Sequence, residues 1–505
     1  MNRTFLKTFE FCHFEEINDE KSKRFQTFKI SPCGRNDTDP KFFLLLVVIV
    51  FLLGGCTLAP RYERPDAPVP SQWPTGAAYN TASAAPAPAV SELAWREFII
   101  DETLQKIIEA ALKNNRDLRV AALNAERAEA LYGIGKVSIL PSVNATGSWT
   151  KARVPADLSS SGSAMTSERY DVNLGITSWE IDFFGRIRSL KDQALEQYLA
   201  TDEARRSAQM VLISTVTQAY LALAANREAL QLVTKTLETQ ESTYKIIRKR
   251  HDVGMTSELD LMRAQSQVDI ARGDVARYTQ LTAQAENALH LLVGTPVLPE
   301  LLPSQLAGIR PPREISAGLS SELLLRRPDV LAAEHQLKAA NANIGAARAA
   351  FFPRISLTAV LGTASADLSG LFKSGSGAWS FTPQIVMPIF DARTWFAYDV
   401  TKIDKEIYVA QYEKAIQTAF REVADALAVK GTVNQQIEAQ QSLVDALAVA
   451  YRLSGSRYAK GIDSYLSVLD AQRSLYGAQQ GLIMLQLARL NNAVALYKAL
   501  GGGEK

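Results

Sequence analysis

The sequence has little charge, few aromatic residues, three cysteines and no hydrophobic run long enough to cross a bilayer as a helix. Charged residues make up 21% of the 505 residues, and 55 basic residues balance 53 acidic ones. This near-neutral balance argues against a nucleic-acid-binding protein. The longest apolar run, Phe42 to Leu53, falls short of the roughly 20 residues of a transmembrane helix, which argues against a helical membrane protein. The run instead has the length of a signal-peptide core.

One cysteine follows that run directly. The stretch Leu53 to Cys56 has the sequence LGGC and resembles the lipobox of bacterial lipoproteins. In that class the signal is cut before the cysteine, which is acylated and anchors the protein to a membrane. The alternative is an ordinary secretory signal followed by a chance cysteine. Cys12 and Cys33 lie upstream of the cut, so the mature chain contains no cysteine pair for an internal disulfide.

The first 94 residues are expected to lie outside the folded part. Residues 1–55 are the predicted signal peptide, with an N-terminal extension so long and mixed in charge that we expect the true start further downstream. Residues 56–94 are predicted to form a lipidated, extended tether, because 57–91 are rich in Pro, Ala and Ser without periodicity. The folded part is then expected to begin at Trp95. Global disorder is excluded, since 47% of the residues are hydrophobic.

The rest of the chain is a tandem duplication, with repeats at 95–300 and 301–505. At an offset of 212 the stretch 117–145 aligns with 329–357, and at an offset of 207 the later parts of the two repeats align. The change in offset falls between the two strands predicted for each repeat, where a loop can vary in length. Because a repeat fixes the architecture, each element is expected twice.

Each repeat is predicted to contain one moderately long helix and two very long ones. The predicted helices span, in chain order, 102–137, 188–249, 257–293, 317–350, 394–456 and 464–499. The longest would extend about 90 Å. Apolar residues such as Leu212, Val216 and Ala219 recur in steps of four and three, the spacing of a coiled-coil seam. This periodicity alone also fits a simple coiled coil or a soluble four-helix bundle.

Two strands are predicted in each repeat, at 141–153, 169–181, 353–365 and 378–390. Apolar and polar residues alternate along them, as in Tyr170, Val172, Leu174 and Ile176. A barrel with lipid outside and water inside has this pattern, and so does a half-buried soluble hairpin. The export signal, the strand lengths and the aromatic residues near strand ends favour the barrel. Because four strands cannot close, two, three or four copies must associate and give 8, 12 or 16 strands.

Several motifs together resemble one known family. Besides the lipobox they are WREF from Trp95, NNRDLR from Asn114, FGRIRS from Phe184, RRPD from Arg326, AARAAFFP from Ala346 and LDAQRS from Leu469. The set resembles the TolC-like outer-membrane factors, in the acylated OprM-like branch that serves RND-type multidrug efflux. The resemblance covers essentially the whole mature chain. It implies an α/β membrane protein: a trimer with a 12-stranded β-barrel, four strands per chain, and a long periplasmic α-helical barrel.

The same resemblance implies a function and a location. The protein would be the outer-membrane channel of a tripartite efflux pump in a Gram-negative bacterium, a passive exit duct for drugs and other small molecules. Its implied partners are two further copies of itself, a periplasmic adaptor protein, an inner-membrane RND-type transporter and outer-membrane lipid; nucleic acid is not expected. Thr57, in place of an aspartate after Cys56, is consistent with outer-membrane sorting. The alternatives are a duct for type I secretion or metal efflux and, in another class, a structural periplasmic coiled-coil lipoprotein.

The turns between the long helices are the first candidate site. Gly254 and Gly461 suit the left-handed position after a helix, and Ser257 and Ser464 suit the N-cap of the next one. The resemblance implies that both turns form the periplasmic end and contact the adaptor. The residues assigned to this contact are Val253, Gly254, Thr256, Lys460, Gly461 and Asp463.

A candidate gate follows the second turn. Leu466, Asp470 and Arg473 share one helical face. The resemblance implies that three copies of Leu466 form an apolar constriction, and that Asp470 and Arg473 form a ring of ion pairs between chains. The alternative is an ordinary solvated pair between Asp470 and Arg473. TolC itself has a second aspartate where this chain has Ser467, so a cation-binding double ring of carboxylates is not expected.

No enzyme pattern is found. His251, His290 and His335 lack the spacing of metal ligands, and Gly133 and Gly135 lie at a helix end rather than after a strand. We therefore expect no catalytic residue, no metal and no cofactor other than the covalent lipid on Cys56.

Overall fold

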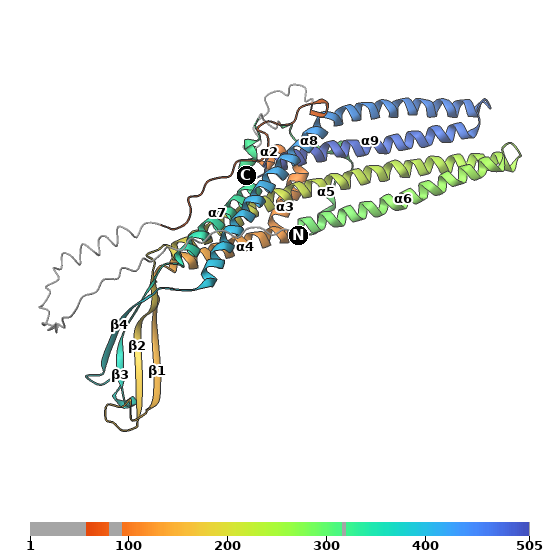
Figure 1. Cartoon of the computed structure of the whole chain (residues 1–505). Coiled ribbons are helices and arrows are strands. Elements are labelled where there is room, and N and C mark those ends of the chain that lie inside the picture. The colour runs from red at the N-terminus through yellow and green to blue at the C-terminus, as the bar shows by residue number, and fades with distance from the viewer. Residues whose placement is uncertain (1–56, 80–92, 316–319, 504–505) are drawn as a thin grey trace, which may run out of the picture. The chain divides into compact units, whose positions relative to one another are not determined.

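The computed structural model describes residues 57–79, 93–315 and 320–503, all within one compact unit, Gly54–Lys505. The predicted signal peptide and the lipidation site Cys56 lie outside the described residues. Figure 1 shows long paired helices at one end of this unit and a sheet at the other. The order of helix, two strands and two long helices occurs twice.

The four long helices form two hairpins. Their bounds are α5 (Arg186–Asp252), α6 (Glu258–Val293), α8 (Ala392–Ala459) and α9 (Tyr465–Ala499). These bounds agree with the predicted ranges to within three residues at every end. With 68 residues, α8 extends about 100 Å. The α5/α6 pair is the first hairpin and the α8/α9 pair is the second.

The predicted first helix of each repeat is interrupted, so both predictions of one continuous helix are wrong. In repeat one, α3 (Glu102–Asn114) and α4 (Arg116–Val137) are separated by Asn115, whose backbone is extended. The Asn115 side chain accepts a hydrogen bond from Leu118 N and donates one to Leu292 O. It therefore caps the second helix and anchors the break. Asparagine competes with the helical backbone in this way, and the apolar periodicity does not reveal it.

In repeat two the break has a different cause. The 3-10 helix η5 (Ser321–Arg326) precedes α7 (Pro328–Ala349). Proline is favoured at the first helical position, while the residue before it is forced into an extended conformation. Arg327 has that conformation, and its guanidinium donates to Asp329, to Glu422 and to the carbonyl of Ala499.

The predicted coiled-coil seam forms the core. Val216, Leu223 and Val423 are fully buried, and one apolar cluster continues from the long helices to α2 (Trp95–Phe98) and α3. Helix α5 contains a window apolar enough to cross a membrane, but most of that window is buried against other helices. Packing therefore accounts for its hydrophobicity. The remaining short elements are η1 (Ala77–Tyr79), η3 (Pro299–Leu301), η4 (Leu306–Gly308) and η6 (Leu368–Gly370).

The four predicted strands form one antiparallel sheet in the order β1-β2-β3-β4. Their bounds are β1 (Val143–Val154), β2 (Met165–Ile181), β3 (Arg354–Ser365) and β4 (Gly377–Val386). The alternation is in register, because Ala145, Leu174, Leu361 and Trp379 lie opposite one another across all four strands. One face is therefore apolar and the other polar. Strand β4 ends four residues earlier than predicted, before Pro388, a residue that cannot donate to the ladder.

Two glycines show which face of the sheet is concave. A Cβ atom at Gly175 would collide with the backbone of Ala359 and Val360, and one at Gly362 with the carbonyl oxygen of Val172. Both glycines lie on the polar face, because Leu174 and Leu361 next to them lie on the apolar one. Neighbouring backbones approach so closely only where the sheet bends sharply toward that face. The polar face is therefore the inner face of the curve.

The prediction that the folded part begins at Trp95 is wrong. Residues Thr57–Tyr79, hereafter the strap, are docked along α7 and α8. The Arg64 guanidinium binds both carboxylate oxygens of Glu334, and Pro60 O accepts from the Asn341 amide. The Trp73 ring stacks on Phe420 with 5.3 Å between centroids. Each residue of an extended segment makes its own separate contacts, so docking requires no hydrophobic periodicity. For this reason the composition of the strap resembled that of a free tether.

Candidate functional site

The turn of the first hairpin is rigid and apolar at its surface. Gly254 has φ 73°, a conformation that favours glycine, and Met255 N donates to Arg250 O at 2.7 Å. The Val253 side chain is 69% exposed. Thr256 Oγ1 donates to Asp260 Oδ2 at 3.4 Å, which ties the turn to the first turn of α6.

The second turn has the same left-handed glycine and the same kind of backbone hydrogen bond as the first, and it adds an ion pair. Gly461 has φ 75°, and Ile462 N donates to Arg457 O at 3.0 Å. The Arg457 guanidinium donates to both oxygens of Asp463, at 2.6 and 3.0 Å, and holds the pKa of that carboxyl below its usual range. The Lys460 side chain is exposed and forms no ion pair with any described residue. Each turn therefore presents exposed residues on a fixed backbone.

The predicted gate residues lie together on an exposed face of α9, directly after the second turn. Leu466 is 40% exposed, and the Asp470 carboxylate forms no hydrogen bond or ion pair with another side chain in the described part of the chain. Arg473 donates from Nε to Gln267 Oε1 at 3.1 Å. The solvated pair within one chain, which was the alternative interpretation of Asp470 and Arg473, is absent from the described residues.

A pair of the same kind near the first turn, three positions out of register with Asp470 and Arg473, behaves differently. Arg263 and Asp260, at the same spacing near the first turn, form an ion pair of 3.5 Å within α6. Asp260 Oδ2 also accepts a hydrogen bond from Ser257 Oγ, so its charge is used inside one hairpin. Asp470 and Arg473 of the second hairpin therefore lack an ion-pair partner among the described residues, whereas Asp260 and Arg263 of the first hairpin pair with each other.

An apolar cluster on the neighbouring face of α9 fixes the orientation of the gate residues. Ile247 and Ala264 of the first hairpin pack against Tyr465, Val468 and Leu469. These five residues are hereafter the tip cluster. Burial raises the pKa of the Tyr465 hydroxyl. Since the cluster holds one side of α9 against the first hairpin, it fixes the rotation of α9 and leaves Leu466, Asp470 and Arg473 exposed on the neighbouring face.

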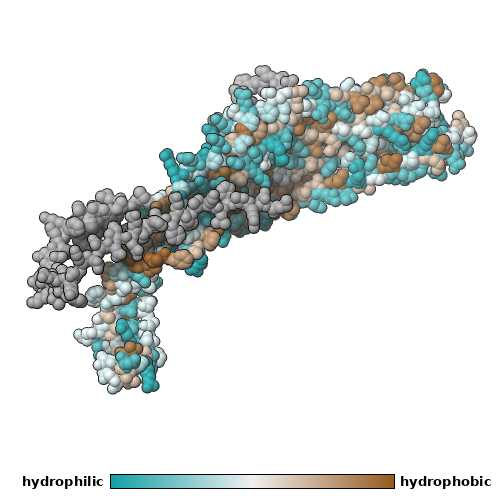
Figure 2. Space-filling model, in the orientation of Figure 1, coloured by the Kyte–Doolittle hydropathy of each residue, from teal (hydrophilic) through white to brown (hydrophobic). Residues whose placement is uncertain are grey.

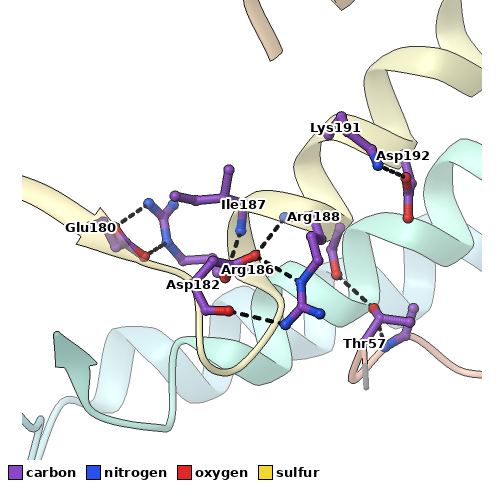
Figure 3. Close-up of polar contacts among 10 residues, drawn as sticks. Thr57, Glu180, Asp182, Arg186, Ile187, Arg188, Lys191 and Asp192 are labelled. Atoms are coloured by element: carbon purple, nitrogen blue, oxygen red, sulfur yellow. Dashed lines mark hydrogen bonds and ion pairs between the residues drawn. The ribbon is translucent and has the colours of Figure 1, made fainter. Parts of the chain in front are cut away.

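A polar corner joins the sheet to the helices (Figure 3). Asp182 accepts hydrogen bonds from Ile187 N and Arg188 N and so caps the start of α5. The Arg186 guanidinium binds both carboxylate oxygens of Glu180, at 2.8 and 2.6 Å. In the sequence, the stretch Phe184 to Ser189 contributed only to the family resemblance. The sequence signal for this cap is the aspartate four residues before Arg186, which the family motif does not include.

The strap reaches the same corner. Thr57 Oγ1 lies 3.0 Å from the buried Ser189 Oγ. Figure 3 shows Thr57 near the first turn of α5. A Cβ atom at Gly345 would collide with Ala59, so α7 leaves room for the strap there.

Aromatic side chains mark both ends of the apolar face. Near the free end of the sheet, the Trp149 ring lies 6.1 Å from that of Tyr170. At the helix end, Trp179 Nε1 donates to Ile139 O, and the exposed Phe390 follows β4. Tyr170 and Trp179 are nine residues apart on β2, about 30 Å along a strand, close to the height of a lipid-facing band in a barrel. Figure 2 shows further apolar surface gathered where the sheet meets the helices.

Comparisons with known proteins agree with this geometry. The family model described as "Outer membrane efflux protein" matches residues 107–295 and 319–502. The antibiotic efflux pump outer membrane protein ArpC and the toluene efflux pump outer membrane protein TtgC, both of Pseudomonas putida, are each 48% identical over 464 residues, covering 92% of this chain and 96% of the relative. The crystal structure of the open state of the Neisseria gonorrhoeae outer membrane channel MtrE is 39% identical with a TM-score of 0.79, covering 89% of this chain and 99% of that one.

Proposed function

The chain belongs to the family of outer membrane efflux proteins, and we propose that three copies of it form the passive exit duct of a tripartite efflux pump. It is an outer-membrane efflux channel with the TolC-like fold. The observation that carries the proposal is the in-register sheet with one apolar face, joined to long helical hairpins. The apolar face suits lipid, and the concave polar face suits a water-filled lumen.

The exposed edges of the sheet and of the helical layer support the proposal that several chains close into a ring. Strands β1 and β4 are the two edge strands of the sheet, and a free edge is not tolerated in hydrocarbon. In the helical layer α4 contacts α5, α5 contacts α7 and α7 contacts α8, so α4 and α8 are the edge helices. The exposed apolar stripe on α4 consists of Val120, Leu123, Leu131 and Ile134, and the one on α8 of Phe396, Val400, Ile403 and Ile407. Two different apolar edges favour head-to-tail association into a ring.

In the trimer, the exposed face of α9 would close the periplasmic end. Leu466 supplies an apolar constriction, and the free carboxylate of Asp470 pairs with Arg473 of the next chain. This assignment is supported by the absence of a partner for Asp470 within the described residues. Opening separates the three hairpins and breaks these pairs.

Removing the charges should open the gate. The double variant Asp470→Ala, Arg473→Ala is expected to raise single-channel conductance in planar bilayers, because the ring of pairs no longer holds the hairpins together. Asp269→Ala with Arg272→Ala is the matched control, since that exposed pair has the same spacing on α6. Unchanged conductance in the Asp470 and Arg473 variant, with trimers intact, would contradict the gate assignment.

We further propose that the two turns bind the periplasmic adaptor. Val253 and Ile462 are exposed apolar residues on turns whose backbones are fixed by Gly254 and Gly461, and Lys460 offers an unpaired cation beside them. Thr256 and Asp463 hold the turns in shape. A rigid surface of this kind binds with little loss of conformational entropy. The adaptor in turn would connect the channel to an inner-membrane RND-type transporter.

The cargo is proposed to be drugs and organic solvents, because the relatives are named for antibiotic and toluene efflux. Deletion of the gene, tested against a panel of drugs, solvents and metal salts, examines this directly. Increased sensitivity to drugs and solvents is expected, with complementation by the intact gene. Sensitivity confined to metals would favour a metal-efflux duct instead.

Acylation of Cys56 is proposed from the lipobox and from the position of Thr57. Acyl chains on Cys56 would anchor the mature chain to the outer membrane. Mass spectrometry of the mature N-terminus tests this proposal, and an unmodified cysteine would exclude it.

A further inference from the structure

A cavity of about 560 Å³ lies between the strap, α7 and the first part of α8, and is hereafter the strap cavity. Figure 1 shows α7 and α8 next to the sheet, where they also contact each other. Pro60 of the strap, Ile344 and Arg348 of α7 and residues of α8 between Tyr398 and Glu406 line the cavity. Its volume lies within the range of small-molecule sites, about 300 to 1,000 Å³.

Two cations from different helices meet at one aromatic ring in this cavity. The guanidinium carbon of Arg348 lies 5.8 Å and Lys402 Nζ lies 4.7 Å from the centre of the Tyr398 ring. Arg348 Nε also donates to Tyr398 Oη at 3.3 Å, and Nη1 donates to Leu58 O at 3.2 Å. Arg348 forms no ion pair within the described part of the chain. A guanidinium that is fixed in place but has no carboxylate partner suits an anionic ligand such as a phosphate.

The charges that line the strap cavity do not cancel. The three basic side chains are Arg348, Lys402 and Lys405, and the two acidic ones are Asp399 and Glu406. Lys402 pairs with Asp399 at 2.7 Å. Lys405 and Glu406 form no ion pair with any residue that the structure describes. One positive charge is therefore left over, and a ligand with a single negative charge complements it.

The residues between the sheet and the cavity follow the order of a membrane interface. Ile389 and Phe390, which come after the last strand, are 88% and 89% exposed. Next along the chain, the exposed Trp395 ring packs edge-on against Phe351 at 4.8 Å. Tyr398 and the cations of the cavity come one turn later. Apolar, then aromatic and then charged residues are what a chain meets as it passes from hydrocarbon to the headgroups.

The distances along the chain place the cavity at the polar border of the membrane. Arg348 lies six residues before Arg354, the first residue of β3. Lys402 lies ten residues after the start of α8, about 15 Å along the helix. Its side chain leans toward the N-terminus of α8, which is the end next to the sheet. Both cations are therefore within reach of the headgroup layer that borders the hydrocarbon.

The cavity opens on the side of the helical layer that carries the strap. Phe420, which stacks on Trp73 of the strap, follows Lys402 by 18 residues, or five helical turns, so both share one face of α8. Ile403, at the rim of the cavity, belongs to the stripe proposed to contact the next chain. A strap that begins at a membrane anchor, as proposed for this chain, runs outside the lumen. The strap cavity therefore faces lipid headgroups rather than the channel interior.

We propose that the strap cavity binds the headgroup of an anionic phospholipid, phosphatidylglycerol, from the periplasm-facing leaflet of the outer membrane. Its single phosphodiester charge is bound between Arg348, Lys402 and Lys405, and its glycerol hydroxyls donate to Glu406. The acyl chains extend past Trp395 toward the apolar face of the sheet. Phosphatidylethanolamine has no net charge and leaves the extra positive charge of the cavity uncompensated. The inference goes beyond the proposed exit duct and depends on neither the gate nor the cargo.

The test measures bound lipid by native mass spectrometry of the trimer purified from outer membranes, with phosphatidylglycerol or phosphatidylethanolamine added in equal amounts. Lys405→Gln and Arg348→Gln are each expected to lower phosphatidylglycerol binding roughly fivefold, the effect of one cation at a membrane surface. Lys405 forms no hydrogen bond within the described ranges, so its loss leaves the strap docked. The matched control is Lys235→Gln, an exposed lysine of α5 about 70 Å from the start of that helix, which should bind as the wild type does.

Two results would overturn the lipid site. One is equal binding of phosphatidylglycerol by the wild type and by both cavity variants. The other is equal binding of phosphatidylethanolamine and phosphatidylglycerol by the wild type, which would indicate surrounding membrane lipid only. Lys405→Gln should keep the trimer band and the single-channel conductance of the wild type. A failure of the lipid site therefore leaves the exit duct standing, and a chain that exported no drug could still bind the lipid.

Discussion

A single buried carboxylate, Glu334, holds the strap on α7. Its side chain is 3% exposed and accepts hydrogen bonds from Arg64 and Tyr62, while Lys338 lies 3.0 Å away. Burial alone would raise the pKa of Glu334, but the bonds from Arg64 and Lys338 outweigh it and lower the pKa. A lowered pKa in the folded state means stability that is present above the ordinary carboxyl range and lost as the pH falls through the folded value.

Breaking this contact should release the strap. Arg64→Ala is expected to weaken strap docking by roughly 1 to 3 kcal/mol, because a buried carboxylate loses its bidentate partner. Limited proteolysis of the purified trimer measures the exposure of the strap, and acidification below the carboxyl range should expose the wild-type strap as well. The control is Arg96→Ala, which removes the ion pair between Arg96 and Glu109, two exposed side chains. Equal protection of the strap in both variants would contradict this role of Glu334.

At the scale of elements, the sheet depends on glycine where its strands approach most closely. Gly175 and Gly362 face the backbones of the neighbouring strands on the concave side, so a side chain there would force β2 and β3 apart. Next to these glycines the pairing of β2 with β3 contains a β-bulge between Ile176 and Trp179, and Ser178 has φ 54°. A bulge increases the local bend of a strand. Bulge and glycines together give the sheet its curvature.

Filling this space should prevent barrel formation. Gly362→Val is expected to abolish the heat-modifiable trimer band, because its Cβ collides with the carbonyl oxygen of Val172. Gly377→Val, at a strand position with open space around the Cβ, should assemble normally. Trimers of normal mobility in the Gly362 variant would show that curvature does not depend on this glycine.

At the scale of the whole molecule, one chain has two unlike apolar edges. The α4 and α8 stripes and the edge strands β1 and β4 lie on opposite sides of the layers to which they belong. Exposed apolar surface of this extent marks an interface. The polar residues of the lumen and the gate face of α9 acquire their function only once these edges meet.

A charge in one edge should therefore prevent association. Ile403→Asp, on the α8 stripe and 60% exposed, is expected to yield monomers in detergent by light scattering, because the carboxylate would be buried in the interface. Lys402→Asp, the adjacent residue on another face of α8, should remain trimeric. Trimeric Ile403→Asp would exclude this stripe from the interface.

The sequence by itself determined the duplication, the four strands, the long helices and the family, because these follow from local periodicity and motif spacing. Heptads and period-two alternation are repeated over many residues and need no knowledge of distant partners. The gate and the turns could be named from the resemblance, and their roles stay predictions.

The tertiary structure decided what depends on contacts between distant residues. It revealed the break at Asn115, the docking of the strap on Glu334, the concave face of the sheet and the side-chain hydrogen bonds between α6 and α9. The partners in these contacts lie up to 272 positions apart in the sequence. No local pattern records such a pairing, because each side chain on its own is an ordinary polar residue of a helix or a loop.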